Sequence, residues 1–371
     1  MKLVHALLIT LPLSASVAQA PGYSRERARI DSLVNAEVSG TPIAGLAIAV
    51  VKGRDTLVMR GYGFADIENE VPATPAHVFR IGSVTKQFTS SAIMQLVEQG
   101  RLSLEDTLAA LLPNMPASWR KVTLRQLLNH TSGIPSYTST PRWQPRWRDD
   151  VAVDSLLGFV SGDTMNFAAG SQFRYNNTGY VLLGMIVEKT SGQPYARYVE
   201  DRFSKPLGLT GTMYCTARPI IKHRAQGYER QGKQLVNAEY LSMTHPHAAG
   251  ALCSTVRDLI KWNDALHRGV VVKLASLGLM ATPVSGAAAT ARYGFGLGLD
   301  TLSGHRRVAH GGGIHRFQSM LAHYPDDGLT VAVLSNSTPA PVGRIATNIA
   351  RIVLGLPVEA APPPRPVTPE E

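Results

Sequence analysis

The sequence lacks any long apolar run after residue 20, so it offers no segment suited to a membrane-spanning helix. The first residues, MKLVH, ALLITLPL and SASVAQA, combine a basic start, a short apolar middle and a small-residue end. This is the pattern of a secretory signal peptide. Cleavage after Ala18 and cleavage after Ala20 both remain open, since the second would leave Pro21 at the new terminus. Residues 1–20 are therefore predicted to export the protein to the periplasm or the medium.

Acidic residues are outnumbered, with 27 Asp and Glu against 37 Lys and Arg, which gives a formal net charge of +10. The basic residues are scattered, except in PRWQPRWRDD at 141–150, so nothing resembles a nucleic-acid footprint. A diffuse positive surface fits solubility as well as attraction to anionic cell-envelope polymers. With 44% hydrophobic residues, the chain can bury a large core.

Cysteine is scarce, and Cys215 and Cys253 are the only two. An oxidising compartment permits their pairing, but separate buried thiols remain equally open because the sequence does not give their separation. Neither lies in a metal-ligand spacing. The His-Glu-x-x-His and Gly-x-Ser-x-Gly patterns are also absent, which argues against a zinc protease and an α/β-hydrolase nucleophile elbow. The pair His245 and His247 lacks acidic partners, and we interpret it as loop or core.

Hydrophobic periodicity predicts a helix at 24–38, a hairpin at 45–63 and a helix at 83–98. Further helices are predicted at 123–129, 151–160, 178–190, 194–203, 255–267 and 341–354, and antiparallel strands at 293–300, 306–312, 315–325 and 329–336. Strands at both ends of the chain with helices between them predict an α/β fold of the α+β type. One antiparallel sheet would be built from both chain ends and flanked by helices, with a mainly helical region inserted.

These elements predict one folded domain over residues 21–357. Its sheet region would take about 24–80 and 285–357, and its helical region about 81–284. The end of the chain, residues 358–371, is rich in proline and has too little apolar surface to offset its ordering entropy. It is predicted to be a disordered tail.

Ser83 and Lys86 lie three residues apart at the start of the predicted helix 83–98. Positions i and i+3 share a helix face, so a neutral Lys86 amine could accept the Ser83 proton. The free N–H groups of the helix start would favour developing negative charge. Ser83 could equally be a helix cap. The spacing alone does not decide, because it recurs at Ser118 and Lys121.

Tyr175 and Asn177 form a Tyr-x-Asn sequence at the entrance to the predicted helix 178–190. The tyrosine could relay protons, and the asparagine could bind Lys86 or a substrate amide. A turn closed by the asparagine side chain, with the tyrosine packed beneath, is the alternative.

His310 is followed by Gly311, Gly312 and Gly313 at a predicted strand edge. Glycines there would let a substrate lie against the backbone. A backbone N–H of this segment, paired with that of Ser83, would form an oxyanion hole. A flexible glycine loop is the alternative.

Together these three groups resemble, in the same order, the three signatures of the serine β-lactamase and penicillin-binding-protein superfamily. The resemblance is closest to its class C-like branch, which includes class C β-lactamases, D-stereospecific peptidases and esterases. It covers roughly residues 25–355, with further similar stretches at 127–134, 173–195, 206–212 and 310–336. It implies a serine β-lactamase-like fold for the domain.

The resemblance also implies a covalent mechanism. Ser83 would attack a carbonyl, Lys86 and Tyr175 would carry its proton, and water would free the acyl-enzyme, with no metal or organic cofactor. Which of the two is the immediate base stays open. By position, Gly313 corresponds to the second oxyanion donor. The implied partner is a small molecule or peptide with an ester, amide or lactam bond, and peptidoglycan fragments are a further candidate.

The chain departs from that family at His310 and Gly311, where its β-lactamases usually have lysine and threonine. A histidine is mostly neutral near pH 7, so a cation for a substrate carboxylate is reduced or lost. Arg316 and His315 are candidates to replace it, or they lie on the solvent face of the strand. We therefore expect an ester or amide hydrolase, with D-amino-acid peptides or β-lactams as possible substrates. A class C-like β-lactamase proper, and a non-catalytic peptidoglycan-binding or scaffold protein, are the alternatives.

Overall fold

The computed structural model describes residues 21–360, apart from 233 and 290. The predicted signal peptide lies outside the described residues, and so does the predicted tail from residue 361 onward. Within the described part of the chain, no helix has both the length and the apolar character needed to cross a membrane.

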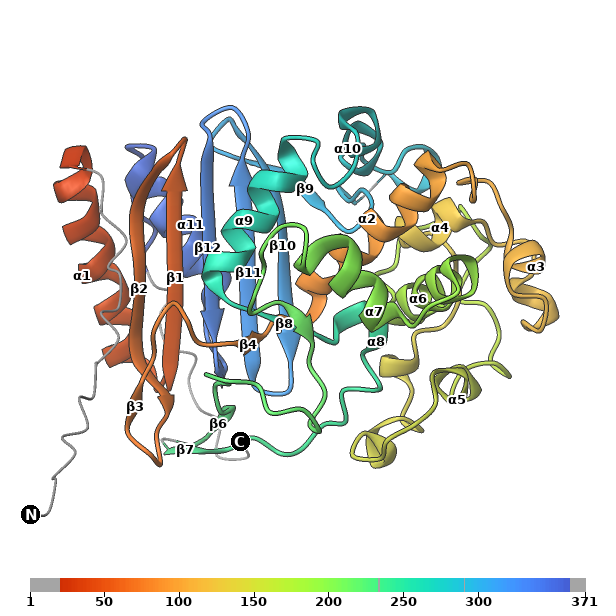
Figure 1. Ribbon diagram of the computed structural model, residues 1–371, viewed down its shortest axis with the longest axis horizontal. Helices are drawn as coiled ribbons and strands as arrows, with labels where there is room; N and C mark the ends of the chain where they lie inside the picture. The colour runs from red at the N-terminus through yellow and green to blue at the C-terminus, as the bar shows by residue number, and fades with distance from the viewer. Residues whose placement is uncertain (1–20, 233, 290, 361–371) are drawn as a thin grey trace, which may run out of the picture.

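A seven-stranded antiparallel sheet forms one side of the molecule, in the order β3-β2-β1-β12-β11-β10-β9 (Figure 1). Strands β1 and β12 are central and pair from Leu46↔Ser335 to Lys52↔Leu329, so the two ends of the chain meet there. This confirms the predicted antiparallel sheet built from both ends. The strands are β1 (Gly45–Lys52), β2 (Asp55–Asp66), β3 (Val71–Pro72), β9 (Gly298–Leu302), β10 (His305–Ile314), β11 (Phe317–Tyr324) and β12 (Leu329–Ser335).

Helices cover both faces of the sheet, which explains why the central strands are apolar on both sides. In β1, Leu46 and Ile48 share a hydrophobic cluster with residues of α1 (Ser24–Gly40) and α11 (Val342–Val353). The alternate residues Ala47 and Ala49 belong to the other cluster, which contains α9 (Val256–His267). Side chains alternate along a strand, so each face meets its own helices. In Figure 1, α9 crosses the front of the sheet.

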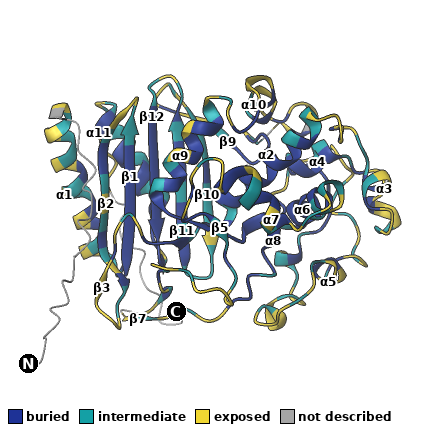
Figure 2. Cartoon of the chain, viewed as in Figure 1, coloured by how far each residue is buried: buried dark blue, intermediate teal, exposed yellow. Residues whose placement is uncertain are grey.

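The inserted region packs around two helices, α2 (Thr85–Glu98) and α6 (Asn177–Ser191), which are among the most buried elements in Figure 2. A short 3₁₀ turn, η2 (Gly82–Val84), precedes α2 and contacts β10, which joins this region to the sheet. The remaining helices are α3 (Leu108–Leu111), α4 (Leu124–Leu128), α5 (Val153–Gly158), α7 (Tyr195–Val199), α8 (His247–Gly250) and α10 (Leu274–Met280).

Several element boundaries differ from the sequence expectations. The predicted helix 194–203 is α7 followed by a π-helical turn at Glu200–Ser204. The predicted strand 293–300 begins only at Gly298. The segment before it packs closely against another loop, because a Cβ added at Gly294 would lie 1.9 Å from the carbonyl oxygen of Met280.

The region predicted to be mainly helical also contributes four strands, β5 to β8, to two small sheets, β4-β8-β5 and β13-β6-β7. Their strands have two to four residues, too few to show a periodicity of two. The strands are β4 (Phe79–Arg80), β5 (Met213–Tyr214), β6 (Tyr228–Gln231), β7 (Gln234–Asn237), β8 (Leu252–Ser254) and β13 (Ser337–Thr338).

Cys215 and Cys253 form a disulfide, which settles the alternatives that the sequence left open. Their Cα atoms are 5.4 Å apart, a normal separation for such a bond. Strand β5 ends directly before Cys215 and pairs with β8, which contains Cys253. The disulfide therefore reinforces the sheet whose strand β4 leads into Ser83.

Candidate active site

Ser83 lies in η2 and Lys86 in the first turn of α2, so the two share one face of a helix start. Their side chains meet, with Lys86 Nζ 3.0 Å from Ser83 Oγ. Gly82 has a φ of 48°, and a Cβ there would lie 3.0 Å from the backbone nitrogen of Gly313. Only glycine fits that turn easily, and it lets the serine approach the edge of β10.

Lys86 is completely buried, yet no carboxylate pairs with it among the described residues. Besides Ser83, its Nζ contacts Asn177 Oδ1 at 2.9 Å and the carbonyl oxygen of Ala249 at 2.8 Å. Burial lowers the pKa of Lys86 well below its usual value of 10.5. The arrangement therefore favours an uncharged amine next to the serine.

Asn177 is the first residue of α6, and its side chain contacts Lys86. The capping role at this helix start is taken by the preceding residue. Asn176 accepts a hydrogen bond from the backbone N–H of Gly179 through its side chain. The Asn177 side chain is thereby free, and its Nδ2 donates to Thr138 Oγ1 at 3.0 Å. This bond turns the amide oxygen toward Lys86.

Tyr175 comes from the loop before α6, and its hydroxyl lies close enough to Ser83 to influence its titration. Lys86 Nζ lies 4.7 Å from the centre of the Tyr175 ring. Packing around the ring raises the pKa of Tyr175 above its ordinary value of 10, although the residue is 39% exposed, and the nearby Ser83 hydroxyl offsets part of that rise. The phenol is therefore protonated at neutral pH. Residues 83, 86, 175 and 177 thus share one site.

His310 lies in β10 behind this group and is buried. Its Nδ1 lies 2.6 Å from the carbonyl oxygen of Gly311, an acceptor, so this nitrogen carries the proton. Its Nε2 then accepts from the hydroxyl of Tyr293 at 2.8 Å. Burial, followed by the proximity of Lys86, lowers the pKa of His310 to about 4. His310 therefore supplies no positive charge at neutral pH.

The three glycines bring the β10 backbone against η2. A Cβ on Gly312 would lie 2.0 Å from the carbonyl oxygen of Ile81 and 2.9 Å from the backbone nitrogen of Ser83. Larger residues are therefore excluded at this position. Gly311 would meet only an ordinary contact of 3.4 Å with Met320, and Gly313 nothing within 4 Å. Close approach thus requires glycine at only one of the three positions.

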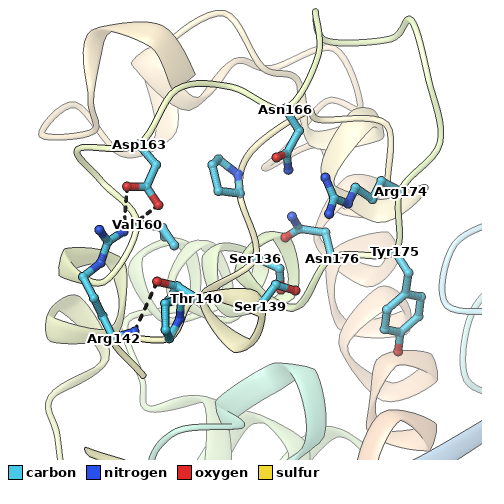
Figure 3. A pocket seen from close by; sticks show the side chains of 12 residues that line it. Ser136, Ser139, Thr140, Arg142, Val160, Asp163, Asn166, Arg174, Tyr175 and Asn176 are labelled. Atoms are coloured by element: carbon cyan, nitrogen blue, oxygen red, sulfur yellow. Dashed lines mark hydrogen bonds and ion pairs between the residues drawn. The ribbon is translucent and has the colours of Figure 1, made fainter. Parts of the chain in front are cut away.

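A cavity of about 270 Å³ opens over the serine, which we call the nucleophile cavity. Ser83, Asn177 and Gly313 line it, together with His315 of the turn after β10. Tyr137, Thr138 and Trp143 also line it, so the aromatic and basic segment 136–150 contributes to this cleft. A second cavity of about 320 Å³ borders Tyr175 and Asn176, and Figure 3 shows it with the ion pair between Arg142 and Asp163.

Two neighbours of the site were not identified from the sequence, His130 and Tyr293. The His130 ring lies 4.4 Å from that of Tyr175 and 4.8 Å from that of Tyr293, centre to centre. Its Nδ1 accepts from the backbone N–H of Asn176 at 3.1 Å, which holds the loop that carries Tyr175. A single histidine or tyrosine gives no periodic signal, although both lie in segments that the sequence analysis had marked.

The alternative cation, nucleophile and metal-ligand candidates from the sequence have surroundings that do not suit those roles. Arg316 forms an ion pair with Glu229, and burial lowers the pKa of His315 to about 4, so neither provides a free cation for the site at neutral pH. Ser118 is exposed in a short 3₁₀ turn. His245 bonds Trp143 Nε1 and the carbonyl oxygen of Asp149. No cluster of three potential metal ligands occurs in the part of the chain that the structure describes.

Comparisons with known proteins support one family. The family model described as Beta-lactamase matches residues 30–355. Penicillin-binding protein 4* of Bacillus subtilis is 31% identical over 308 residues, covering 78% of this chain and 67% of that protein. Protein flp of Staphylococcus aureus is 28% identical over 339 residues, covering 86% of this chain, which spans only 65% of that protein's length.

Among solved structures, the D-amino acid amidase from Ochrobactrum anthropi SV3 superimposes with a TM-score of 0.80 at 25% identity. The match covers 90% of this chain and 99% of the amidase. The fold and the sequence thus agree over nearly the whole described chain. We conclude that this chain belongs to the beta-lactamase family.

Proposed function

We propose that this protein is an exported serine hydrolase that forms an acyl-enzyme on Ser83 and hydrolyses esters or amides. The observation that carries the proposal is the buried Lys86 amine, 3.0 Å from Ser83 Oγ and without a carboxylate partner in the described chain. Burying a lysine side chain is unfavourable, because the amine must either stay charged in an apolar environment or lose its proton. Next to a serine at a cavity, the neutral amine that results can act as a base.

The hydrogen bonds of Lys86 support its role as the first proton acceptor. A neutral amine has two N–H groups and one lone pair. Asn177 Oδ1 and the carbonyl oxygen of Ala249 are acceptors only, so they take both N–H groups. The lone pair then faces Ser83 Oγ, which donates its proton as it attacks the substrate carbonyl.

Tyr175 is suited to the opposite task. Its raised pKa keeps it protonated, and its hydroxyl lies near the serine oxygen that would hold the acyl group. In our proposal, the leaving group takes a proton from this phenol, and the phenolate recovers one from the Lys86 ammonium. A water molecule then attacks the acyl carbonyl and gives a proton to Lys86 or Tyr175. The same two residues return a proton to the Ser83 oxygen as the acyl group leaves.

The oxyanion would be held by the backbone N–H groups of Ser83 and Gly313, which line the same cavity. His310 has a structural role in this scheme, because it is neutral and bonded to Tyr293 and Gly311. A permanent cation for a substrate carboxylate is therefore absent from its position. This favours esters and amides that place no carboxylate next to His310 over β-lactams that do, and a D-amino-acid amide is a fitting substrate given the amidase relative.

Labelling with a fluorophosphonate probe, followed by peptide mapping, tests the proposal. We expect one modified peptide containing Ser83, no labelling of Ser83→Ala, and unchanged labelling of Ser118→Ala. The second variant is a matched control, because Ser118 also precedes a lysine by three residues but is exposed. Turnover of p-nitrophenyl esters, nitrocefin and D-alanyl peptides then sets the substrate class. Absence of both labelling and turnover, with binding to peptidoglycan retained, would favour the non-catalytic alternative.

A further inference from the structure

A third cavity, of about 370 Å³, lies next to the nucleophile cavity, and His315 lines both. We call it the arginine cavity, because Arg80 and Arg224 line it together with Phe317 and Tyr240. Arg80 belongs to β4, three residues before Ser83. The arginine cavity therefore lies beside the candidate site, since Arg80 is close to Ser83 in the sequence and His315 lines both cavities.

Arg80 has no carboxylate within ion-pair distance in the described chain, although it is half-buried. Its guanidinium carbon lies 5.6 Å from the centre of the Phe317 ring. Burial, and then the neighbouring Arg224, lower the pKa of Arg80 to about 10, so it remains charged at neutral pH. A cation held against an aromatic ring without an acidic partner is a ready receptor for an anion.

A second arginine of this cavity also lacks an acidic partner, whereas most other charged groups nearby form ion pairs. Arg224 donates to the carbonyl oxygens of Thr216 and Pro219, which carry no charge. Glu239 pairs with Arg148 at 2.9 Å, and Arg316 pairs with Glu229. Glu68 bonds Asn237 and is exposed at the rim. Two arginines thus face one solvated carboxylate, and the cavity keeps a positive excess.

His315 forms part of the wall that the two cavities share. Its Nε2 is buried and has no hydrogen-bond partner among the described atoms, and its ring packs edge-on against Trp147 at 4.7 Å. It follows Gly313 by two residues, which corresponds to about 7 Å of extended chain. A ligand that runs from Gly313 into the arginine cavity would pass the His315 side chain.

The position of Tyr175 indicates which half of a substrate enters. Tyr175 borders the cavity of Figure 3, and in the proposed mechanism it protonates the leaving group. The leaving group would therefore lie toward Tyr175, and the acyl part would extend past Gly313 and His315, which line the nucleophile cavity. The acyl part is the half that stays bound to Ser83 in the intermediate.

We propose that the arginine cavity is a subsite for an anionic acyl group, in which Arg80 binds a carboxylate at the far end of the part that becomes attached to Ser83. This inference rests on the proposed acyl-enzyme mechanism and specifies its substrate class. The preferred substrate is an ester or amide of a dicarboxylic acid, or of a peptide acid, with its free carboxylate several bonds from the reacting carbonyl.

The test compares p-nitrophenyl monoesters of adipic, pimelic and suberic acid with the p-nitrophenyl esters of hexanoic, heptanoic and octanoic acid. Each pair matches in chain length and leaving group and differs only in the terminal carboxylate. We expect kcat/KM to favour the anionic ester by about tenfold or more at one chain length, as a charge-assisted hydrogen bond provides. Arg80→Gln should remove that preference mainly through KM and leave the neutral esters unaffected. Arg80→Lys should restore part of it.

Two matched variants control for other sources of charge. Arg54→Gln removes an exposed arginine from the turn between β1 and β2, and it should leave the preference intact. Arg174→Gln removes an arginine beside Tyr175, on the leaving-group side, and should also leave it intact. Equal losses in Arg54→Gln and Arg80→Gln would make the effect one of overall charge and overturn the subsite. Ser83-dependent turnover of neutral esters without any anionic preference would also overturn it, whereas loss of all turnover would count against the proposed function.

Discussion

Asn177→Asp tests whether the site depends on an uncharged Lys86. The substitution keeps the size of the side chain and places a carboxylate where the amide oxygen now lies, 2.9 Å from Lys86 Nζ. In the native protein, burial lowers the lysine pKa and no carboxylate opposes this in the described surroundings. The new charge would favour the ammonium form and so oppose the burial effect.

The expected size follows from the distance. Two unit charges at 2.9 Å attract by about 6 kcal/mol at an effective dielectric constant of about 20. Burying the new carboxylate offsets part of this, but each 1.36 kcal/mol that remains is roughly a tenfold change in the fraction of neutral amine. We therefore expect kcat/KM at pH 7 to fall by about a hundredfold or more, and the acidic limb of the pH profile to move to higher pH.

The assay is kcat/KM for a p-nitrophenyl ester from pH 5 to pH 10, with the melting temperature as a check on folding. Asn166→Asp adds the same charge at an exposed position that lines the cavity of Figure 3, and its profile should match that of the native protein. A stable Asn177→Asp protein with an unshifted profile would refute the assignment of Lys86 as the neutral base.

Three further outcomes are expected. Lys86→Met should abolish turnover. Because the pKa of Lys86 is lowered from 10.5 in the folded state, the unfolded chain binds one more proton than the folded chain below about pH 10. The free energy of unfolding of the native protein, measured in urea titrations, should therefore fall relative to that of Lys86→Met by up to ~1.4 kcal/mol per pH unit as the pH falls. The same pH dependence in both proteins would contradict a neutral lysine. His310→Lys should raise turnover of nitrocefin relative to p-nitrophenyl acetate, because it adds a permanent cation where a neutral ring now lies, and an unchanged ratio would disprove this account of selectivity. Cys215→Ala combined with Cys253→Ala should lower the free energy of unfolding by about 4 kcal/mol, since the disulfide closes a loop of 38 residues, and a loss under 1 kcal/mol in urea titrations would show that the loop is constrained in other ways.

Local features of the sequence were sufficient to predict much of the sheet and the serine–lysine contact. The strands β1 and β12 are long apolar runs, and their positions near the two chain ends led to one antiparallel sheet. Ser83 and Lys86 meet because three residues of helix bring any such pair together. The same spacing occurs at Ser118 and Lys121, and the sequence favoured the first pair only because the Tyr-x-Asn and His-Gly-Gly signatures follow it. The structure adds that Ser118 is exposed.

The sequence could not predict contacts that depend on how distant segments pack. Lys86 is held by Asn177, 91 residues away, and by Ala249, 163 residues away, and the Ser-x-x-Lys spacing gives no information about either partner. The neutrality of His310 was expected from its ordinary pKa. Its burial against Tyr293 was not, because an isolated tyrosine in a loop carries no signal.

The sequence by itself determined the order of the longer helices and strands, the spacing that places Ser83 and Lys86 together at a helix start, and the glycines that follow His310. These depend on neighbouring residues, whose spacing sets which side chains share a face. The tertiary structure alone decided the pairing of the two cysteines, the burial that lowers the pKa of Lys86 and the position of Arg80 in a cavity next to that of the serine. Burial and charge pairing depend on the whole surroundings of a group, and those surroundings exist only after the chain has folded.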